Sequence, residues 1–338
     1  MIRLRRALLA STLLATAVEA LPSAGCIGGD APNAGITVER SLRVNGIERS
    51  YRLRLPATAG AVPMPLLLHF HGYTGSALLS ETTFGRWGPL ADREGLIVVY
   101  PSSTSFVDPL APSSPAITSW NDGTCNAQRG VGPRACSDDV DSYPCPPECG
   151  ECGACDWCSC HDDVAFVEAL IDELEATLCI DADRVYATGF SNGGMFVHRL
   201  ACDLGDRLTA VAPVGGTRAR GYGCTPDARL PSILLVGGRR DQSVPVDGSR
   251  SADGYFYEPI QDVARTWAGA AECSPGPKQS PSGAGSEPEL DCRSYANCDG
   301  DVAIGFCTWD GAHDWPEAGD RQFGNELIWR FFLDAPTR

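Results

Sequence analysis

The chain has 338 residues, enough to bury the core of one large α/β domain or of two small ones. Its formal net charge of −16 argues against nucleic acid or an anionic membrane surface as a partner. Sixteen cysteines exceed what an ordinary reduced cytosolic enzyme carries, so the composition favours an oxidising compartment.

Residues 1–25 have the pattern of a secretory signal peptide. Residues 1–6 are basic, and residues 7–18 are apolar but too few to span a bilayer. Small side chains predict cleavage near residue 20, whereas cleavage near residue 25 would leave Cys26 as the site of a lipid anchor. Ser23 replaces the leucine usual before such a cysteine, so free secretion is favoured over a lipid anchor at the cell surface. No later stretch has the length and apolarity of a transmembrane helix.

The first half of the chain predicts a hairpin followed by two buried strands. Residues 26–37 are expected to form a flexible lead-in to one folded domain, 38–338. Alternating residues over 38–55 predict the hairpin, with its turn at Asn45-Gly46. Continuous apolar runs at 65–70 and 96–100 predict strands buried on both faces, and a helical stretch over 87–94 lies between them.

The second half alternates between helix and strand patterns. Apolar residues recur at helical spacing after Asp163, and Asp162 is placed to cap that helix. Further strands are predicted at 184–190, 208–213, 232–236 and 302–307, and further helices after Ser191, at 259–271 and at 321–332. Strands alternating with helices predict an α/β fold, with a mostly parallel central sheet and helices on both faces.

Gly189-Phe-Ser191-Asn-Gly193 stands where a predicted strand meets a predicted helix, and it fits the pattern G-x-S-x-G. A turn this tight holds its serine exposed, and the glycines are needed because a Cβ would collide with the neighbouring elements. The pattern therefore predicts that Ser191 is a nucleophile.

An activated serine needs a base and an acid, which follow it in the order acid, then histidine, in the α/β-hydrolase arrangement. Asp241 follows the strand at 232–236 and is the expected acid, with Asp247 in reserve. His313 follows the last predicted strand and is the expected base, because His161 and His198 do not satisfy the order.

The developing oxyanion needs backbone N–H donors. Asn192, directly after the nucleophile, is expected to supply one of them. The loop after the strand at 65–70 supplies the other, from Tyr73 or alternatively Gly72. His69 and His71 are then interpreted as structural residues around that loop.

Several further motifs carry a family resemblance, at 51–56, 71–75, 91–101, 119–125, 162–166, 189–195, 199–202, 241–245 and 313–316. Together they resemble secreted α/β-hydrolase esterases related to polyhydroxybutyrate depolymerases, feruloyl esterases and acetylxylan esterases. The resemblance implies Ser191 as nucleophile, Asp241 as acid, His313 as base, and the amides of Tyr73 and Asn192 as oxyanion donors. The chain departs from the family at Val236-Gly-Gly238, where a His-Gly pair is usual, and in a long insertion, 126–161.

The insertion holds seven of the cysteines, with Cys125 at its edge. Their close spacing would suggest a metal site in a cytosolic protein, but behind a signal peptide it favours disulfides that staple a loop with few apolar residues. Elsewhere the expected disulfide sets are Cys202 with Cys224 and the four cysteines 273, 292, 298 and 307, which leaves Cys179 without an evident partner.

The insertion leaves the edge of the sheet where substrate would bind. We expect it to form a cap beside the site, with Trp120, Trp157 and Trp315 as pocket walls; the alternative is a remote stability module.

The resulting expectation is a secreted serine carboxylic-ester hydrolase. Its substrates would be feruloyl or acetyl esters of plant polysaccharide or small soluble esters, with no metal or organic cofactor. The alternatives are a polyhydroxyalkanoate depolymerase, a serine peptidase of the same fold, and a non-catalytic secreted binding protein.

Overall fold

The structure is a computed structural model of the chain. It describes residues 34–59, 62–108, 111–123, 135–140, 144, 146–149, 155, 157, 159–221, 223–224, 229–279, 290–318 and 322–337. The predicted signal peptide and most of the lead-in, together with Cys26, lie outside these residues.

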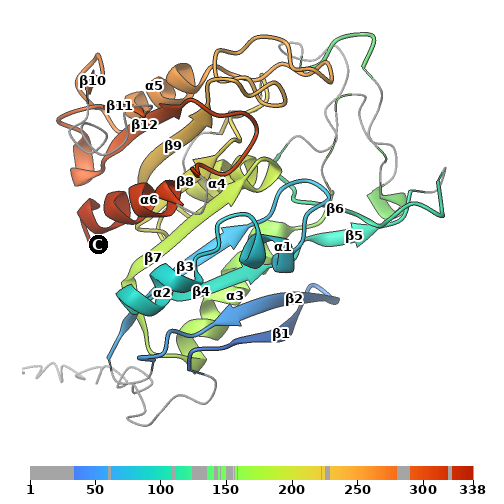
Figure 1. The fold of residues 1–338 in the computed structure, drawn as a ribbon, viewed down its shortest axis with the longest axis vertical. Coiled ribbons are helices and arrows are strands. Elements are labelled where there is room, and N and C mark those ends of the chain that lie inside the picture. Colours follow the sequence, from blue (N-terminus) through green and yellow to red (C-terminus); the bar gives the residue numbers. More distant parts are fainter. Residues whose placement is uncertain are drawn as a thin grey trace, which may run out of the picture.

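A ten-stranded sheet forms the centre of the molecule (Figure 1). Six neighbouring strands run parallel, and antiparallel strands complete both edges. In spatial order the strands are β1 (Thr37–Val44), β2 (Ile47–Arg54), β4 (Ile97–Pro101), β3 (Met64–Phe70), β7 (Ile180–Phe190), β8 (Ala210–Val214), β9 (Ser232–Gly238), β12 (Ile304–Trp309), β11 (Asp291–Ser294) and β10 (Lys278–Gln279). A separate two-stranded sheet pairs β5 (Thr104–Phe106) with β6 (Ile117–Ser119).

Helices cover both faces of the central sheet. One apolar core packs α3 (Asp163–Thr177), α4 (Asn192–Asp203) and α5 (Ile260–Ala270) against one face. A second core packs α1 (Ala77–Thr82), α2 (Gly88–Glu94) and α6 (Phe323–Asp334) against the other; α2 and α6 lie in front of the sheet in Figure 1. Two short 3₁₀ helices, η1 (Pro147–Cys149) and η3 (Asp299–Asp301), lie in loops. The predicted layers are confirmed.

Local sequence signals account for most element boundaries. Asn45 and Gly46 have φ of 50° and 83°, which is the backbone that a two-residue hairpin turn needs. The Asp162 side chain accepts the Ala165 N–H at 3.0 Å, so the predicted cap of α3 is present. The continuous apolar runs became β3 and β4, whose residues are all buried between the two helical layers.

Three elements of the central fold escaped the sequence analysis: α1, β10 and β11. These elements are short, with between two and six residues each, so no periodicity marks them. The strand predicted at 302–307 is therefore not at the edge of the sheet, because β11 and β10 continue beyond β12.

Each cysteine among the described residues is disulfide-bonded. The expected sets are confirmed as Cys202–Cys224, Cys273–Cys298 and Cys292–Cys307, the last joining β11 to β12. Among the described cysteines of the insertion the pairs are Cys136–Cys155 and Cys149–Cys160, so the disulfide interpretation is confirmed for these four. The expectation for Cys179 was wrong, because this residue is disulfide-bonded. Within the described part of the chain, no helix is long and apolar enough to cross a membrane.

Candidate active site

The carboxyl ends of four parallel strands meet at one edge of the central sheet. Ser191 directly follows β7, Asp241 lies three residues after β9, and His313 lies four residues after β12. The loop that begins at His71 follows β3, the direct neighbour of β7. Residues that are far apart in the sequence therefore converge because parallel strands end together.

Ser191 occupies a strained turn between β7 and α4, with φ of 56° and ψ of −122°. A Cβ at Gly189 would lie 2.5 Å from the carbonyl oxygen of Gly193, and one at Gly193 would lie 2.3 Å from that of Phe70. Both contacts are closer than any side chain tolerates. The two glycines of the pattern are thus required by the packing of β7, α4 and β3, and together they hold the serine in this conformation.

Ser191, His313 and Asp241 form a continuous chain of hydrogen bonds. His313 Nε2 lies 2.9 Å from Ser191 Oγ, and His313 Nδ1 lies 2.7 Å from Asp241 Oδ2. The other carboxylate oxygen of Asp241 accepts the N–H groups of Ser243 and Val244, both at 2.8 Å. Asp241 is buried, so its carboxylate is fixed from both sides and cannot turn away from the imidazole.

The reserve acid and the other histidines lie elsewhere. Asp247 is exposed and accepts the Ser249 N–H at 2.9 Å. His161 pairs with Glu148 at 3.1 Å, within the insertion. His198 is buried inside the fold, where its Nδ1 accepts the Trp267 indole N–H at 3.2 Å, and burial lowers its pKa to about 3. None of the three is hydrogen-bonded to Ser191 among the described contacts.

The loop after β3 lies against the nucleophile, since a Cβ at Gly72 would be 3.2 Å from that of Ser191. Its Gly72 carbonyl is held by His71 Nδ1 at 2.7 Å and by the Gly75 N–H at 3.0 Å. The peptide bond is trans, so the N–H of Tyr73 points away from that fixed carbonyl. Fixing one end of the peptide plane thereby fixes the direction of the Tyr73 amide.

His71 performs this task as a neutral imidazole. Its Nε2 accepts the Ser103 N–H at 3.1 Å, which leaves the proton on Nδ1, where it is donated to Gly72. Burial lowers the pKa of His71 to about 4, so this tautomer persists through the neutral range.

Sequence comparison relates the chain to named esterases. It is 27% identical over 277 residues to feruloyl esterase B of Piromyces equi, covering 80% of this chain and 42% of the relative. It is 28% identical over 176 residues to a probable feruloyl esterase C of Aspergillus niger, covering 52% of this chain and 58% of the relative. A bifunctional acetylxylan esterase/xylanase of Neocallimastix patriciarum is 23% identical over 306 residues, with coverage of 89% and 36%. The chain thus spans about half the length of these relatives or less, and no protein-family model matches it.

Among solved structures, the acetyl xylan esterase from Aspergillus awamori superposes with a TM-score of 0.56 at 13% identity, covering 88% of this chain and 99% of the other. Native sOPH gives a TM-score of 0.53 at 16% identity, with coverage of 93% and 91%. The chain has the α/β-hydrolase fold. The resemblance to feruloyl and acetylxylan esterases that the motifs indicated is confirmed by the sequence relatives.

Two tryptophans that were expected to line a substrate pocket lie in the core of the fold instead. Trp120 is 0% exposed and stacks on Phe196, and its indole N–H bonds the His71 carbonyl at 2.9 Å. Trp315 is 1% exposed and donates its N–H to Asn325 at 2.7 Å. Large apolar rings whose N–H groups are satisfied bury readily, so neither presents a wall to solvent.

Trp157 belongs to a third buried cluster, here called the Trp157 cluster. It joins the insertion to segments beside the site and consists of Cys136, Trp157, Met195, Ala219, Val244, Tyr255 and Tyr257. Met195 lies one helical turn after Ser191, and the Val244 N–H holds Asp241. Cys136 and Trp157 of the insertion therefore pack beside the candidate site.

Sequence reasoning missed the side chain of Asn192 and its partner Asp122. The Asn192 amide group donates to Asp122 Oδ2 at 3.2 Å, and that oxygen also receives the indole N–H of Trp157 at 2.8 Å. Asp122 lies inside the motif at 119–125, but nothing in the local pattern shows that it meets residues 35 and 70 positions away.

Proposed function

We propose that the chain is a serine carboxylic-ester hydrolase that acts through an acyl-enzyme. The observation that carries this proposal is the unbroken chain of hydrogen bonds from Ser191 through His313 to Asp241 at the carboxyl edge of the sheet. The sequence similarity to feruloyl and acetylxylan esterases points to ester substrates.

In the first half of the reaction His313 Nε2 takes the proton of Ser191 Oγ as the oxygen attacks the ester carbonyl. Asp241 keeps the proton of His313 on Nδ1 and stabilises the imidazolium that forms. The carbonyl oxygen becomes an oxyanion beside the amides of Tyr73 and Asn192, of which the second lies at the positive end of α4. The tetrahedral intermediate then collapses, and the alcohol leaves with the proton that His313 returns.

The second half repeats these steps with water in place of the serine. His313 takes a proton from the water, the water oxygen attacks the acyl carbon, and Ser191 leaves as the acid is released. Both halves use the same base and the same two amides. No group beyond those of the chain is needed for the proton transfers.

We further propose feruloyl or acetyl esters of polysaccharide, or small soluble esters, as the substrate class, and secretion as the route of the protein. The names of the sequence relatives support the first proposal. The disulfides of the described cysteines support the second, since such bonds persist in oxidising compartments.

The test is hydrolysis of an ester panel by the oxidised protein beside its Ser191→Ala variant. The panel holds nitrophenyl acetate and butyrate, methyl ferulate, acetylated xylo-oligomers and a hydroxybutyrate oligomer. We expect turnover of one or more esters, and a loss in kcat of at least about 10³-fold in the variant. No turnover of any ester by folded protein, or equal turnover by the variant, would refute the proposal.

A further inference from the structure

The side chain of Asn192 is fully engaged, although only its backbone amide has a proposed chemical role. Asn192 is 2% exposed. Its Oδ1 accepts the backbone N–H of Trp120 at 2.8 Å. Its Nδ2 donates to the Trp120 carbonyl at 3.3 Å and to Asp122 Oδ2 at 3.2 Å. Both partner residues belong to one segment, 119–122, from which the chain enters the insertion.

The returning limb of the insertion closes on the same segment through Trp157. The indole N–H of Trp157 donates to Asp122 Oδ2 at 2.8 Å, so one carboxylate oxygen joins Trp157 to Asn192. The carbonyl of Trp157 accepts the Ser119 hydroxyl at 2.6 Å. Trp157 thus holds the segment at Ser119 and at Asp122, on either side of Trp120.

The ring of Trp157 is anchored in turn. It is 6% exposed and packs edge-on against Tyr255 at a centroid distance of 4.9 Å, within the Trp157 cluster. Buried on all sides, the ring has little freedom to move its N–H away from Asp122.

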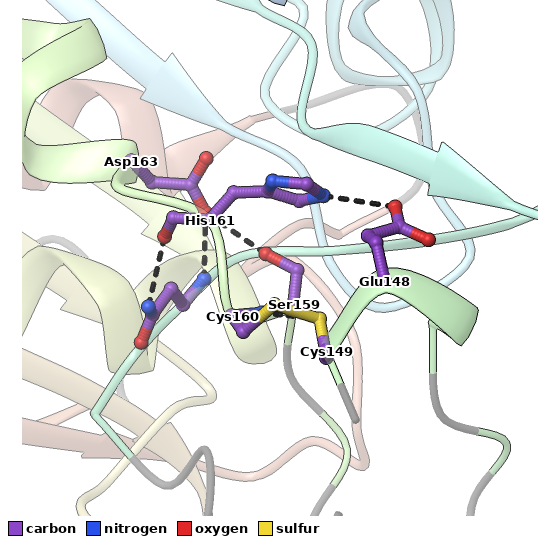
Figure 2. Close-up of a disulfide and its surroundings, with 7 residues drawn as sticks. Glu148, Cys149, Ser159, Cys160, His161 and Asp163 are labelled. Atoms are coloured by element: carbon purple, nitrogen blue, oxygen red, sulfur yellow. Dashed lines mark hydrogen bonds and ion pairs between the residues drawn. A yellow bond between two sulfur atoms is a disulfide. The ribbon is translucent and has the colours of Figure 1, made fainter. Parts of the chain in front are cut away.

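Disulfides and polar contacts fix the limb that carries Trp157. Cys155, two residues earlier, is bonded to Cys136, and Cys160, three residues later, is bonded to Cys149. Figure 2 shows how the end of the limb meets α3: the hydroxyl of Ser159 donates to Asp163. The backbone N–H of Asn121 donates to the same carboxylate oxygen at 2.7 Å. Asp163 is itself buried in an ion pair with Arg49 at 2.6 Å. The limb is therefore tied to the fold directly before and after Trp157.

From this geometry we infer that Trp157 and Asp122 are positioning residues for Asn192, and that the insertion thereby sets the direction of the amide next to the nucleophile. The inference deepens the proposed function and rests on it, because the amide of Asn192 is the proposed oxyanion donor. Loss of a whole oxyanion donor lowers kcat by about 10²–10³-fold, so its misplacement lowers kcat by a fraction of that.

The first arm of the test is kinetic and uses Asp122→Ala and Trp157→Phe. The phenylalanine keeps an aromatic ring in the cluster but lacks the N–H. We expect kcat to fall about 10-fold to 100-fold in Asp122→Ala and less in Trp157→Phe, with KM within about threefold of wild type. Asp122→Asn keeps an acceptor oxygen and is expected to retain most of the activity. In the double variant Asp122→Ala/Trp157→Phe the two losses are expected not to add, because both act through one oxygen.

The control is Trp329→Phe, a buried tryptophan on α6 in the core on the other face of the sheet. It lowers stability by a comparable repacking, and its kcat is expected to stay at the wild-type value. A role of Trp157 in stability alone would give the two variants the same kinetics.

The second arm measures the amide itself and needs no turnover. Ser191-Asn192 is the only Ser-Asn pair in the sequence, so carbonyl-¹³C serine with ¹⁵N asparagine gives a single amide resonance in a carbonyl-selected spectrum. We expect that resonance to shift or broaden in Asp122→Ala and Trp157→Phe but not in Trp329→Phe. Unchanged resonance in the first two variants, or unchanged kcat in an active enzyme, would overturn the inference. A shifted resonance in a protein that hydrolyses no ester would refute the esterase proposal while supporting the positioning of Asn192.

Discussion

The two amides proposed to bind the oxyanion are held by different parts of the molecule. The amide of Tyr73 is directed by the buried imidazole of His71, which holds the carbonyl of Gly72 in the loop after β3. Asn192 is directed by a carboxylate and an indole, and the indole belongs to the insertion. The first arrangement depends on the protonation state of one ring within the fold. The second depends on the disulfides of Cys155 and Cys160, which lie before and after Trp157 in the insertion.

This difference shows how an insertion can help to position an active-site residue without supplying an atom that reacts. The sheet places the serine, the histidine and the aspartate, whatever loops it carries. The insertion only has to hold Asp122, which in turn satisfies the buried amide group of Asn192. Such a group costs free energy if it is left without partners. The arrangements that hold the amides of Tyr73 and Asn192 should therefore be disrupted by different substitutions and conditions.

The largest expected loss of activity comes from the loop that holds the amide of Tyr73. His71→Ala removes the donor to the Gly72 carbonyl and frees the peptide plane, so we expect kcat to fall about 10²–10³-fold, as for loss of one oxyanion donor. His71→Asn places an N–H near the position of Nδ1 and should recover part of that loss. Steady-state kinetics on the preferred ester, with thermal unfolding as a check on folding, measure both. Equal kcat for the alanine variant and the wild type would show that the loop holds its shape without the imidazole.

Acid should lower the stability of the fold through its buried histidines. His69, His71 and His198 are buried, and burial lowers their pKa values from 6.5 to about 3, 4 and 3. As pH falls from about 6 towards 4, the unfolded chain takes up protons on these residues that the folded chain does not. The free energy of unfolding should therefore fall by about 1.4 kcal/mol per pH unit for each of them.

Urea unfolding of wild type and His71→Asn over this pH range measures that slope. The variant should lose about one histidine's share of it, that is, about 1.4 kcal/mol per pH unit. A variant with the wild-type slope would mean that His71 is not kept neutral by the fold.

The smallest expected loss of activity comes from opening the disulfide that follows Trp157 in the insertion. Cys149→Ala/Cys160→Ala releases the limb after Trp157 while the polar contacts to α3 remain, so we expect kcat to fall about threefold to tenfold, less than for a lost donor. The matched pair Cys273→Ala/Cys298→Ala opens a longer loop of 25 residues against 11 and should cost more stability at unchanged kcat. Kinetics and unfolding midpoints for both pairs test this. The same ratio of lost activity to lost stability in the two pairs would count against a special role of the insertion.

Most of the fold was predictable because its signals are local. The cap at Asp162, the turn at Asn45-Gly46 and the apolar runs of β3 and β4 each lie within a few residues of what they specify. The strand ends then place Ser191, Asp241 and His313 together by topology alone, which a sequence can reveal through the order of its elements.

The rest depends on contacts between distant residues. Nothing near Trp120 or Trp315 distinguishes a buried indole from the wall of a pocket, because that depends on Phe196 and Asn325 closing over them. The pairing of Cys149 with Cys160 could not be chosen among the many connectivities of the insertion. Asp122 carried no signal of its own, since its partners come from two other segments.

The contacts of Trp315 bear on the stage of translation at which the candidate active site is assembled. Trp315 lies two residues after His313 and bonds Asn325 on α6, and the amide of Asn325 in turn bonds the Gly85 carbonyl near α2. The ribosome makes Ser191 first, Asp241 next, and His313 and α6 last. We therefore expect His313 to be held beside Ser191 only after α6 has emerged and docked. Stalling translation just before and just after α6, and reacting each nascent chain with a serine-directed fluorophosphonate, would show whether the nucleophile becomes reactive only at that last step.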